Sequence, residues 1–308
     1  MYKYILKRLL MVIPVIVGVT FIIFSLSYIT PGDPADFILG DSAPREAKER
    51  LREELGLNDP FFVRYANFII NAVQGDLGQS YNTRRSVSDE ILARFPTTMH
   101  LAGMGLALAV FLGVTLGVIS ATKQYSIFDN LATVFGLVFV SIPNFWLGMM
   151  MVIIFAVNLK WFPPSGFSSP IQWVLPTVTL GTGQMAAIMR MSRSSMLEVV
   201  RQDYIRTARS KGQKESVVIW KHALRNALIP VTTYVGLTFG FLLAGAVLTE
   251  TIFSINGMGR FMVQSVMNRD LPIMLGGVLI LSVAFSLVNL LVDILYAYLD
   301  PRIKSQYK

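Results

Sequence analysis

The side chains that could bind a metal in this chain are few. Its 308 residues contain no cysteine and two histidines, His100 and His222. The lack of cysteine excludes disulfides and Cys-ligated metal sites. The two histidines fall on opposite sides of the membrane in the predicted topology, so they cannot chelate one ion together. The sequence therefore predicts no metal site in this chain.

Nucleotide hydrolysis needs a phosphate cradle such as G-x-x-x-x-G-K-[ST]. The chain contains no Gly-Lys pair. If ATP is used, ATP and Mg must be bound by a separate subunit, and we expect no cofactor in this chain. An intramembrane protease would need paired aspartates, an H-E-x-x-H helix or a Ser/His pair at matched depth, and none of these patterns is present. The sequence thus predicts a chain that is not an enzyme.

One acidic residue, Asp293, lies within a long apolar stretch. Ionisable groups at membrane depth are costly, and they usually face a cavity or a partner. Asn289 lies one helical turn earlier on the same face. Asp293 either pairs with a nearby cation such as Arg302, which is a structural role, or takes part in solute passage. Asn289 and Asp293 are therefore candidates for a pathway or gate.

A basic segment, Arg201 to Pro230, lies between two apolar stretches. Apolar residues recur at helical spacing from Met196 to Lys211, and Gly212 then permits a positive φ or a close backbone approach. One interpretation is a solvated basic loop that only sets orientation. The other is a helix–turn–helix that docks into a groove of a cytoplasmic partner. The recurring apolar residues favour docking, because an orientation signal alone would not need them.

These residues must be positioned by membrane-spanning helices. The chain is 53% hydrophobic and 15% charged, against about 25% charged in soluble domains. About 20 apolar residues cross the roughly 30 Å hydrocarbon core. We expect an all-α polytopic membrane protein with six transmembrane helices, the first of them uncleaved. The six stretches are Leu9 to Thr30, His100 to Thr122, Leu131 to Leu159, Ile171 to Met189, Asn226 to Thr249 and Leu271 to Leu299.

Charge predicts the orientation, because short cytoplasmic loops are enriched in Lys and Arg. With the N-terminus inside, the internal segments hold 16 basic and 5 acidic residues, and the external segments hold 11 and 13. Both termini are therefore expected in the cytoplasm. The net charge of +8 is then mostly a topology signal, and no nucleic acid partner is expected.

Three regions follow from this topology. Residues 1–30 form the N-terminal tail and first span, 31–95 an external loop domain, and 96–308 a core of spans two to six with a cytoplasmic loop at 190–225. In the external domain, Ser42 is expected to cap a helix. A second, amphipathic helix is expected to begin after Pro60.

The third span contains "SIPNFWLGMM", with Pro143 and Asn144 in its middle. A proline within a span frees backbone groups that neighbours or a cavity must satisfy. Pro143 and Asn144 are therefore candidates for a break that faces a pathway.

The basic segment, "DYIRTARSKG" followed by "HALRNALIP", resembles the cytoplasmic loop of a known family. That family is the inner-membrane permeases of binding-protein-dependent ABC importers, in the dipeptide/oligopeptide/nickel branch. The resemblance extends over nearly the whole chain, through "SYITPGDPA", "LGLNDPFFVRY", "GDLGQSY", "FPPSGF", "TETIFSINGMGR" and "LYAYLDPRI", in the order of the branch. In the general form of the loop only Ala208 and Leu224 match, whereas the form of the peptide branch fits throughout.

The resemblance implies a type I importer permease in a bacterial or archaeal cytoplasmic (inner) membrane. The expected partners are a second homologous permease, two cytoplasmic ATPase subunits, an external substrate-binding protein and membrane lipid. The loop is then a coupling helix between spans four and five. The residues it assigns to coupling are Asp203, Tyr204, Ala208, Lys211 and Gly212.

The expected solutes are di- or oligopeptides, delivered by the binding protein to the outer face. The residues from Pro31 to Pro96 and from Thr249 to Asp270 are predicted to contact that protein. Glutathione and nickel complexes are compatible alternatives. An ion-coupled secondary transporter is a further alternative, although the chain shows no internal repeat and no charge at the membrane centre.

Overall fold

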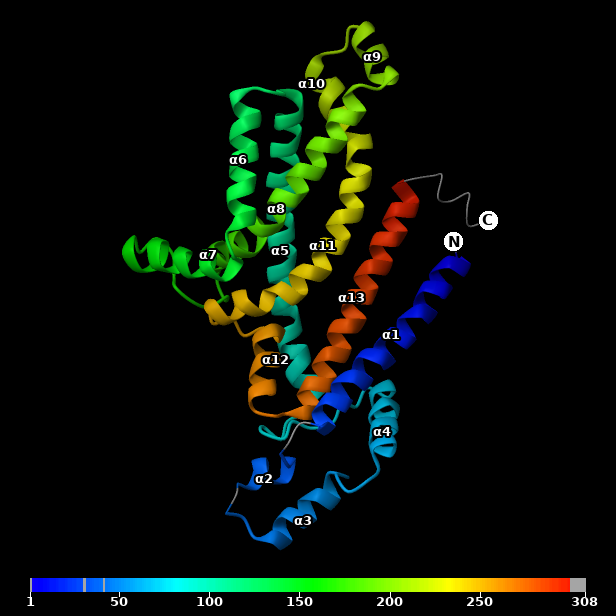
Figure 1. Cartoon of the computed structure of the whole chain (residues 1–308), viewed down its shortest axis with the longest axis vertical. Helices are drawn as coiled ribbons and strands as arrows, with labels where there is room; N and C mark the ends of the chain where they lie inside the picture. Colours follow the sequence, from blue (N-terminus) through cyan, green and yellow to red (C-terminus); the bar gives the residue numbers. More distant parts are fainter. Residues whose placement is uncertain (1, 30–31, 41, 300–308) are drawn as a thin grey trace. The chain divides into compact units, whose positions relative to one another are not determined.

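Helices make up nearly all of the regular structure in the described residues (Figure 1). The computed structural model describes residues 2–29, 32–40 and 42–299, apart from the side chains of residues 2–9, 244–245, 293 and 295–299. Within these residues the regular structure is helical, except for one antiparallel bridge between Gln79 and Ser86. The predicted all-α polytopic class is therefore confirmed.

Four of the described helices are long and apolar enough to cross a membrane. Their apolar portions are Leu10–Ile29, Val87–Thr122, Glu215–Leu243 and Leu271–Val292. They correspond to the first, second, fifth and sixth predicted spans. The second is a single helix that begins 13 residues before its predicted start at His100.

The third predicted span is not one straight helix. α6 (Ile127–Ser141) and α7 (Asn144–Met151) are separated at Pro143, and α7 continues into a π-helical turn, η1 (Val152–Asn158). The two halves meet at 98°, so they form one broken span or a re-entrant loop. Pro143 adopts φ −61° and ψ 133°, the extended conformation that a helix interior cannot accommodate. The predicted break at Pro143 is confirmed, and whether the stretch from Leu131 to Leu159 crosses as one broken span stays a prediction.

The fourth predicted span lies in α8 (Pro170–Val200). α8 is long enough, but it is not among the four helices apolar enough to cross by composition. Its polar residues are buried against neighbouring helices, including Thr179, Thr182, Ser192 and Ser195. The described helices therefore account for four spans by length and composition, or five with the bent pair, and the count of six stays a prediction.

The helices form two compact units. The larger unit contains Thr98–Ile255 and residues 287–299, with residues 2–4. It holds most of α5 (Val87–Thr122), the helices from α6 to α8, and the end of α13 (Leu271–Leu299). Its remaining elements are α9 (Asp203–Ser210), α10 (Glu215–Val217), the π-helical turn η2 (Val218–Ala223) and α11 (Leu224–Ile252).

Close contact between α5 and α8 organises the larger unit. A Cβ on Gly117 would lie 2.7 Å from the Met189 carbonyl oxygen, and one on Gly113 would lie 2.8 Å from that of Met185. Glycine at these positions lets the two backbones approach, as small residues do between membrane helices. α8 also packs against α6, α7 and α11.

The smaller unit contains residues 5–97 and 256–286. It holds α1 (Tyr2–Ile29), α2 (Pro34–Leu39), α3 (Arg45–Glu54), α4 (Phe61–Val73) and α12 (Met258–Met267), with the starts of α5 and α13. Its apolar core joins Leu77, Val87 and Ile91 to Met258, Phe261 and Ile273. By packing, residues 256–286 thus belong with the first loop, and the predicted division into three regions stays a prediction.

The helix predicted after Pro60 is confirmed as α4, which begins at Phe61. The expected cap at Ser42 is wrong, because α3 begins at Arg45 with Pro44 at its N-cap position and no side-chain cap. The capped helix of this region is α2, which the sequence analysis missed. There the Asp33 carboxylate accepts a hydrogen bond from the Ala35 amide at 2.9 Å.

Candidate functional site

The predicted coupling segment forms the short helix α9, next to the ends of α8 and α11 in the larger unit (Figure 1). The expected continuous helix from Met196 to Lys211 is wrong. α8 ends at Val200, and Gln202 adopts φ −72° and ψ 150°, so the chain turns before α9 starts at Asp203. The Gln202 carbonyl then accepts the first α9 bonds, from the amides of Ile205 and Arg206.

The turn places Ile205 in the core. Ile205 is fully buried, with Met196 of α8, Val118 of α5 and Val218 of η2 in the same cluster, and Ala208 packs against that cluster. The apolar residues of the segment therefore anchor α9 to its own chain. These apolar contacts are made within the chain, and the docking of the segment into a partner groove stays a prediction.

That opposite face is polar and mostly basic. Arg206 and Lys211 are exposed, and the side chain of Asp203 is 97% exposed and lies 3.7 Å from the Arg206 guanidinium. Tyr204 is partly exposed, and its hydroxyl accepts a hydrogen bond from the Asn226 amide at 2.7 Å. This bond ties α9 to the first turn of α11. Four of the predicted coupling residues, Asp203, Tyr204, Lys211 and Gly212, are therefore accessible, and Ala208 is partly buried beneath them.

The turn after α9 depends on Gly212, as the sequence predicts. Gly212 has φ +75°, and its amide donates to the Arg209 carbonyl at 2.9 Å. A Cβ built here meets no atom within 4 Å. Glycine is therefore favoured by the left-handed backbone and not by contact within the chain.

An ion pair crosses this turn. The Arg209 guanidinium donates to the Glu215 carboxylate at 2.7 Å, and this hydrogen bond raises the pKa of Arg209. Both side chains are exposed, so the pair contributes at most about 1 kcal/mol. Beside it, the His222 ring contacts the Gln213 side-chain oxygen at 2.7 Å. Polar contacts thus join the two sides of the loop that runs from α9 to η2.

A buried ion pair joins three helices of the larger unit. Arg193 of α8 donates to both oxygens of the Asp129 carboxylate of α6, each at 2.9 Å. The Ser120 hydroxyl of α5 donates to the same carboxylate at 2.5 Å. Asp129 is 4% exposed. The sequence analysis missed this cluster, although an Asp and an Arg flanking two apolar stretches were a signal that could have found it.

The predicted pathway residues lie on different helices. Asn144 is partly buried at the start of α7, where its side-chain oxygen would lie 2.7 Å from a Cβ on Gly183 of α8. Pro143 is exposed. Asn289 is partly buried on α13, and the side chain of Asp293 lies outside the described residues. The described contacts do not join Asn144 to Asn289.

A second buried acid escaped the sequence analysis. α11 continues to Ile252, past the predicted end of the fifth span at Thr249, so Glu250 lies inside the helix. Glu250 is fully buried, and the Thr98 hydroxyl donates to its carboxylate at 2.5 Å. Leu248 and Ile252, two residues before and after Glu250, are apolar, so the sequence offers no reason to end the helix at Thr249.

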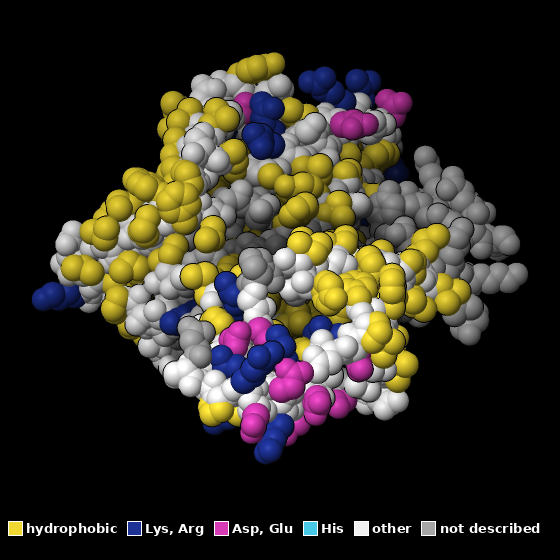
Figure 2. Space-filling model, turned by 60° about the horizontal axis from the view of Figure 1, so that its bottom comes forward, with side chains coloured by type: hydrophobic (Ala, Val, Ile, Leu, Met, Phe, Trp, Pro, Cys, Tyr) yellow, Lys and Arg dark blue, Asp and Glu magenta, His cyan; other side chains and the backbone are white. Residues whose placement is uncertain are grey.

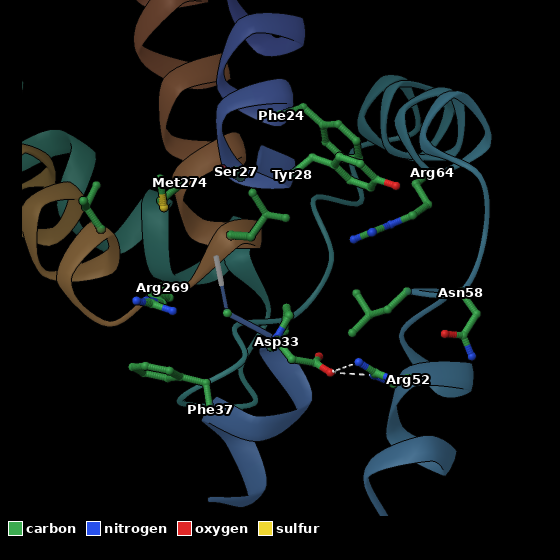
Figure 3. A pocket seen from close by; sticks show the side chains of 15 residues that line it. Phe24, Ser27, Tyr28, Asp33, Phe37, Arg52, Asn58, Arg64, Arg269 and Met274 are labelled. Atoms are coloured by element: carbon green, nitrogen blue, oxygen red, sulfur yellow. Dashed lines mark hydrogen bonds and ion pairs between the residues drawn. The ribbon is translucent and has the colours of Figure 1, made fainter. Parts of the chain in front are cut away.

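The smaller unit carries a cavity of about 520 Å³ (Figure 3). Its lining comes partly from the two segments that are predicted to contact a binding protein, and partly from the end of α1 and the start of α13. Arg52, Arg64 and Arg269 project toward it, with the rings of Phe24, Tyr28 and Phe37 around them. Among the described residues, Asp33 is the one acid that lines it, and the Asp33 carboxylate raises the pKa of Arg52 through their hydrogen bond.

Comparisons with known proteins agree across the whole chain. Residues 113–305 match the family described as the binding-protein-dependent transport system inner membrane component, and residues 1–102 match its N-terminal family. The dipeptide transport system permease protein DppB of Alkalihalophilus pseudofirmus is 44% identical over 99% of this chain and 100% of its own length. The glutathione transport system permease protein GsiC of Escherichia coli (strain K12) is 41% identical over 99% of both chains.

Solved structures support the fold independently. An inward-facing structure of the MetNI methionine ABC transporter matches with a TM-score of 0.59, at 18% identity, over 68% of this chain and 96% of that one. At this identity the likeness concerns the fold alone. Together with the full-length relatives and the matched families, it leads to one assignment: the chain belongs to the inner-membrane components of binding-protein-dependent transport systems, the permease subunits of ABC importers.

Proposed function

We propose that this permease passes di- or oligopeptides, delivered by an external binding protein, across the inner membrane. The observation that carries the proposal is the 44% identity to a dipeptide permease over essentially both full lengths. The chain itself carries out no hydrolysis in this proposal. ATP and Mg are bound by two cytoplasmic ATPase subunits, and a second homologous permease completes the pathway.

The proposed contact with the ATPase subunits is the exposed face of α9. Ile205 and Ala208 pack α9 against α5, α8 and η2. A displacement of α9 by the ATPase subunits would therefore also displace these helices. The exposed Arg206, Arg209 and Lys211 favour an acidic partner surface. Asp203, Tyr204, Ala208, Lys211 and Gly212 are the proposed coupling residues.

The test compares two substitutions at Gly212 in the assembled importer. Asn tolerates the left-handed conformation, whereas Trp adds bulk at the same backbone angle. Because the chain leaves open space at this position, Gly212→Trp is expected to fold and assemble. We expect Gly212→Trp to lose at least tenfold in binding-protein-stimulated ATPase activity and in uptake of a labelled dipeptide. Gly212→Asn is expected to stay within about twofold of wild type.

Two results would contradict the coupling assignment. In one, an intact Gly212→Trp complex retains full stimulation, which would leave the segment as an orientation signal only. In the other, both variants lose stimulation equally, which would assign the loss to backbone strain. Uptake that follows an ion gradient without ATP would contradict the importer mechanism itself.

Glutathione is the second candidate solute, because the glutathione permease relative is 41% identical over 99% of this chain. Uptake of labelled glutathione and of a labelled dipeptide, measured in the same cells with an excess of each unlabelled competitor, separates the two. Nickel complexes remain compatible with the family resemblance and are tested by the same competition.

A further inference from the structure

The cavity of the smaller unit has an excess of positive charge. Its lining includes three arginines and one aspartate. Asp33 is already engaged, since it forms an ion pair with Arg52 and caps α2. The Arg64 guanidinium lies 5.8 Å from the ring centre of Phe24 and 6.0 Å from that of Tyr28. No carboxylate of the described residues pairs with Arg64. The cavity therefore suits an anion.

The cavity also has a defined depth in the membrane. Phe24, Ser27 and Tyr28 belong to the last two turns of α1, whose apolar span ends at Ile29. Leu271 and Met274 belong to the first turn of α13, where the span Leu271–Val292 begins. The end of the first span and the start of the last span thus bound the cavity on one side of the membrane. Phospholipid headgroups lie at this level.

α4 packs along α1 at hydrocarbon depth. The Tyr65 hydroxyl donates to the Val17 carbonyl at 2.8 Å and contacts the Thr20 hydroxyl at 3.0 Å. Val17 is 12 residues before Ile29, which is about 18 Å along the helix axis. The Phe61 ring packs edge-on against the Phe24 ring, with 5.2 Å between the two ring centres. α4 therefore lies within the bilayer and not in the aqueous part of the loop.

The two faces of α4 differ in chemistry. Phe62 is 73% exposed, Val73 is 85% exposed and Ile70 is 54% exposed. At about 100° per residue these three positions lie on one face of α4. Acyl chains would cover these side chains at this depth. Arg64, the single charged residue of α4, projects instead toward the cavity (Figure 3). In Figure 2, acidic and basic side chains gather at the α2 and α3 end of this unit, which forms the aqueous side of the cavity.

We propose that this cavity binds the phosphate group of an anionic phospholipid from the leaflet that faces α2 and α3, the outer leaflet in the predicted orientation. Arg64 binds the phosphate oxygens, for which guanidinium geometry is well suited, and Arg269 adds positive charge to the lining. Phe24, Leu271 and Met274 contact the upper acyl chains, which continue along the exposed face of α4. An amphipathic ligand fits better than an acidic protein side chain, because the cavity joins arginines to apolar walls at headgroup depth.

The experiment measures lipid binding directly, without transport. The full chain, purified with its partner subunits, is titrated with dioleoylphosphatidylglycerol, and bound lipid is counted by native mass spectrometry. We expect Arg64→Gln to weaken the tightest site about tenfold, the effect of losing a charge-assisted contact of about 1.4 kcal/mol. The matched control is Arg45→Gln, which removes an exposed arginine of the same unit outside the cavity. It should leave binding unchanged.

A second variant tests the proposal independently, in case Arg64→Gln does not fold. Ser27→Trp fills the cavity while leaving the arginines in place, and it should remove the same bound lipid. Dioleoylphosphatidylcholine, which carries no net charge, should bind at least fivefold more weakly than phosphatidylglycerol.

Three outcomes would overturn the proposal. The first is equal lipid binding by Arg64→Gln and Arg45→Gln. The second is displacement of the lipid by millimolar glycerol 3-phosphate, which would identify a soluble phosphate as the ligand. The third is weaker docking of the binding protein to Arg64→Gln with lipid binding intact, which would identify the cavity as a protein contact.

Discussion

At the scale of single residues, the ion pair of Asp129 and Arg193 joins α6 to α8. Arg193→Gln would leave a carboxylate that is 4% exposed without its charge partner. We expect a loss on the order of 3 kcal/mol in the free energy of unfolding, the lower end of the range for a broken buried pair, because Arg193 is itself partly exposed. The measurement is denaturant unfolding of the purified chain in detergent.

The control lies on the same helix. Arg190 is exposed on α8, so Arg190→Gln makes the same chemical change outside the cluster and should cost less than about 0.5 kcal/mol. Adding Asp129→Asn to Arg193→Gln should recover part of the loss. Equal stability of the two single variants would show that the pair contributes nothing.

The local sequence predicted those features that depend on the backbone preferences of a single residue type. The positive φ of Gly212 and the break at Pro143 follow from residue type alone. Ile205 was missed because its burial depends on the turn at Gln202, and no breaker residue marks that turn. Asp129 and Arg193 were missed because they are 64 residues apart and only tertiary packing joins them.

At the scale of elements, the approach of α5 to α8 is set by glycine. Gly117→Ala places a methyl group 2.7 Å from the Met189 carbonyl oxygen and 2.6 Å from the Ser192 Cβ. Both neighbours are held by a helix, so we expect overpacking to cost about 1–3 kcal/mol. The measurement is the thermal unfolding midpoint of the purified chain in one detergent.

Gly103→Ala is the matched substitution on α5, because a Cβ there meets no atom within 4 Å. It should change stability by less than about 1 kcal/mol, in either direction. If Gly117→Ala proved as stable as Gly103→Ala, the close contact of α5 and α8 would not be a determinant of this unit.

Apolar length predicted four of the spans but not the course of the third. Proline identifies a break, yet the 98° bend depends on α7 packing against α8, where Asn144 meets Gly183. Composition likewise gave α8 too low an apolar content for a membrane span, because several of its threonine and serine residues are buried by neighbouring helices. Helix-to-helix burial of polar residues leaves no trace in hydropathy.

At the scale of the whole molecule, the orientation in the membrane is testable because the chain has no cysteine of its own. Single-cysteine variants can therefore be labelled without background. We expect Arg45→Cys on α3 to react with an impermeant maleimide in intact cells. Ser210→Cys on α9 should react only after the membrane is opened, because the positive charge of its loop predicts a cytoplasmic position. Both positions are exposed.

The wild-type chain, which has no cysteine to react, is the negative control for this labelling. Reaction of Ser210→Cys in intact cells would reverse the topology and remove α9 as the ATPase contact. Charge counts can predict such an orientation because it is a property of the whole chain. They could not predict that residues 256–286 pack with residues 5–97, since that pairing depends on contacts distant in sequence.

The π-helical turn η2 constrains how this loop can change in length. η2 directly precedes α11 and carries α9 and the Gly212 turn before it. Each residue of an α-helix turns the chain by about 100°. Deleting one residue within Val218–Ala223 would let the turn relax to α-helix and rotate α9 by about that angle about the α11 axis, so its basic face would point elsewhere. We therefore expect insertions and deletions among related sequences to avoid these six residues and to fall instead in the exposed stretch around Gln213.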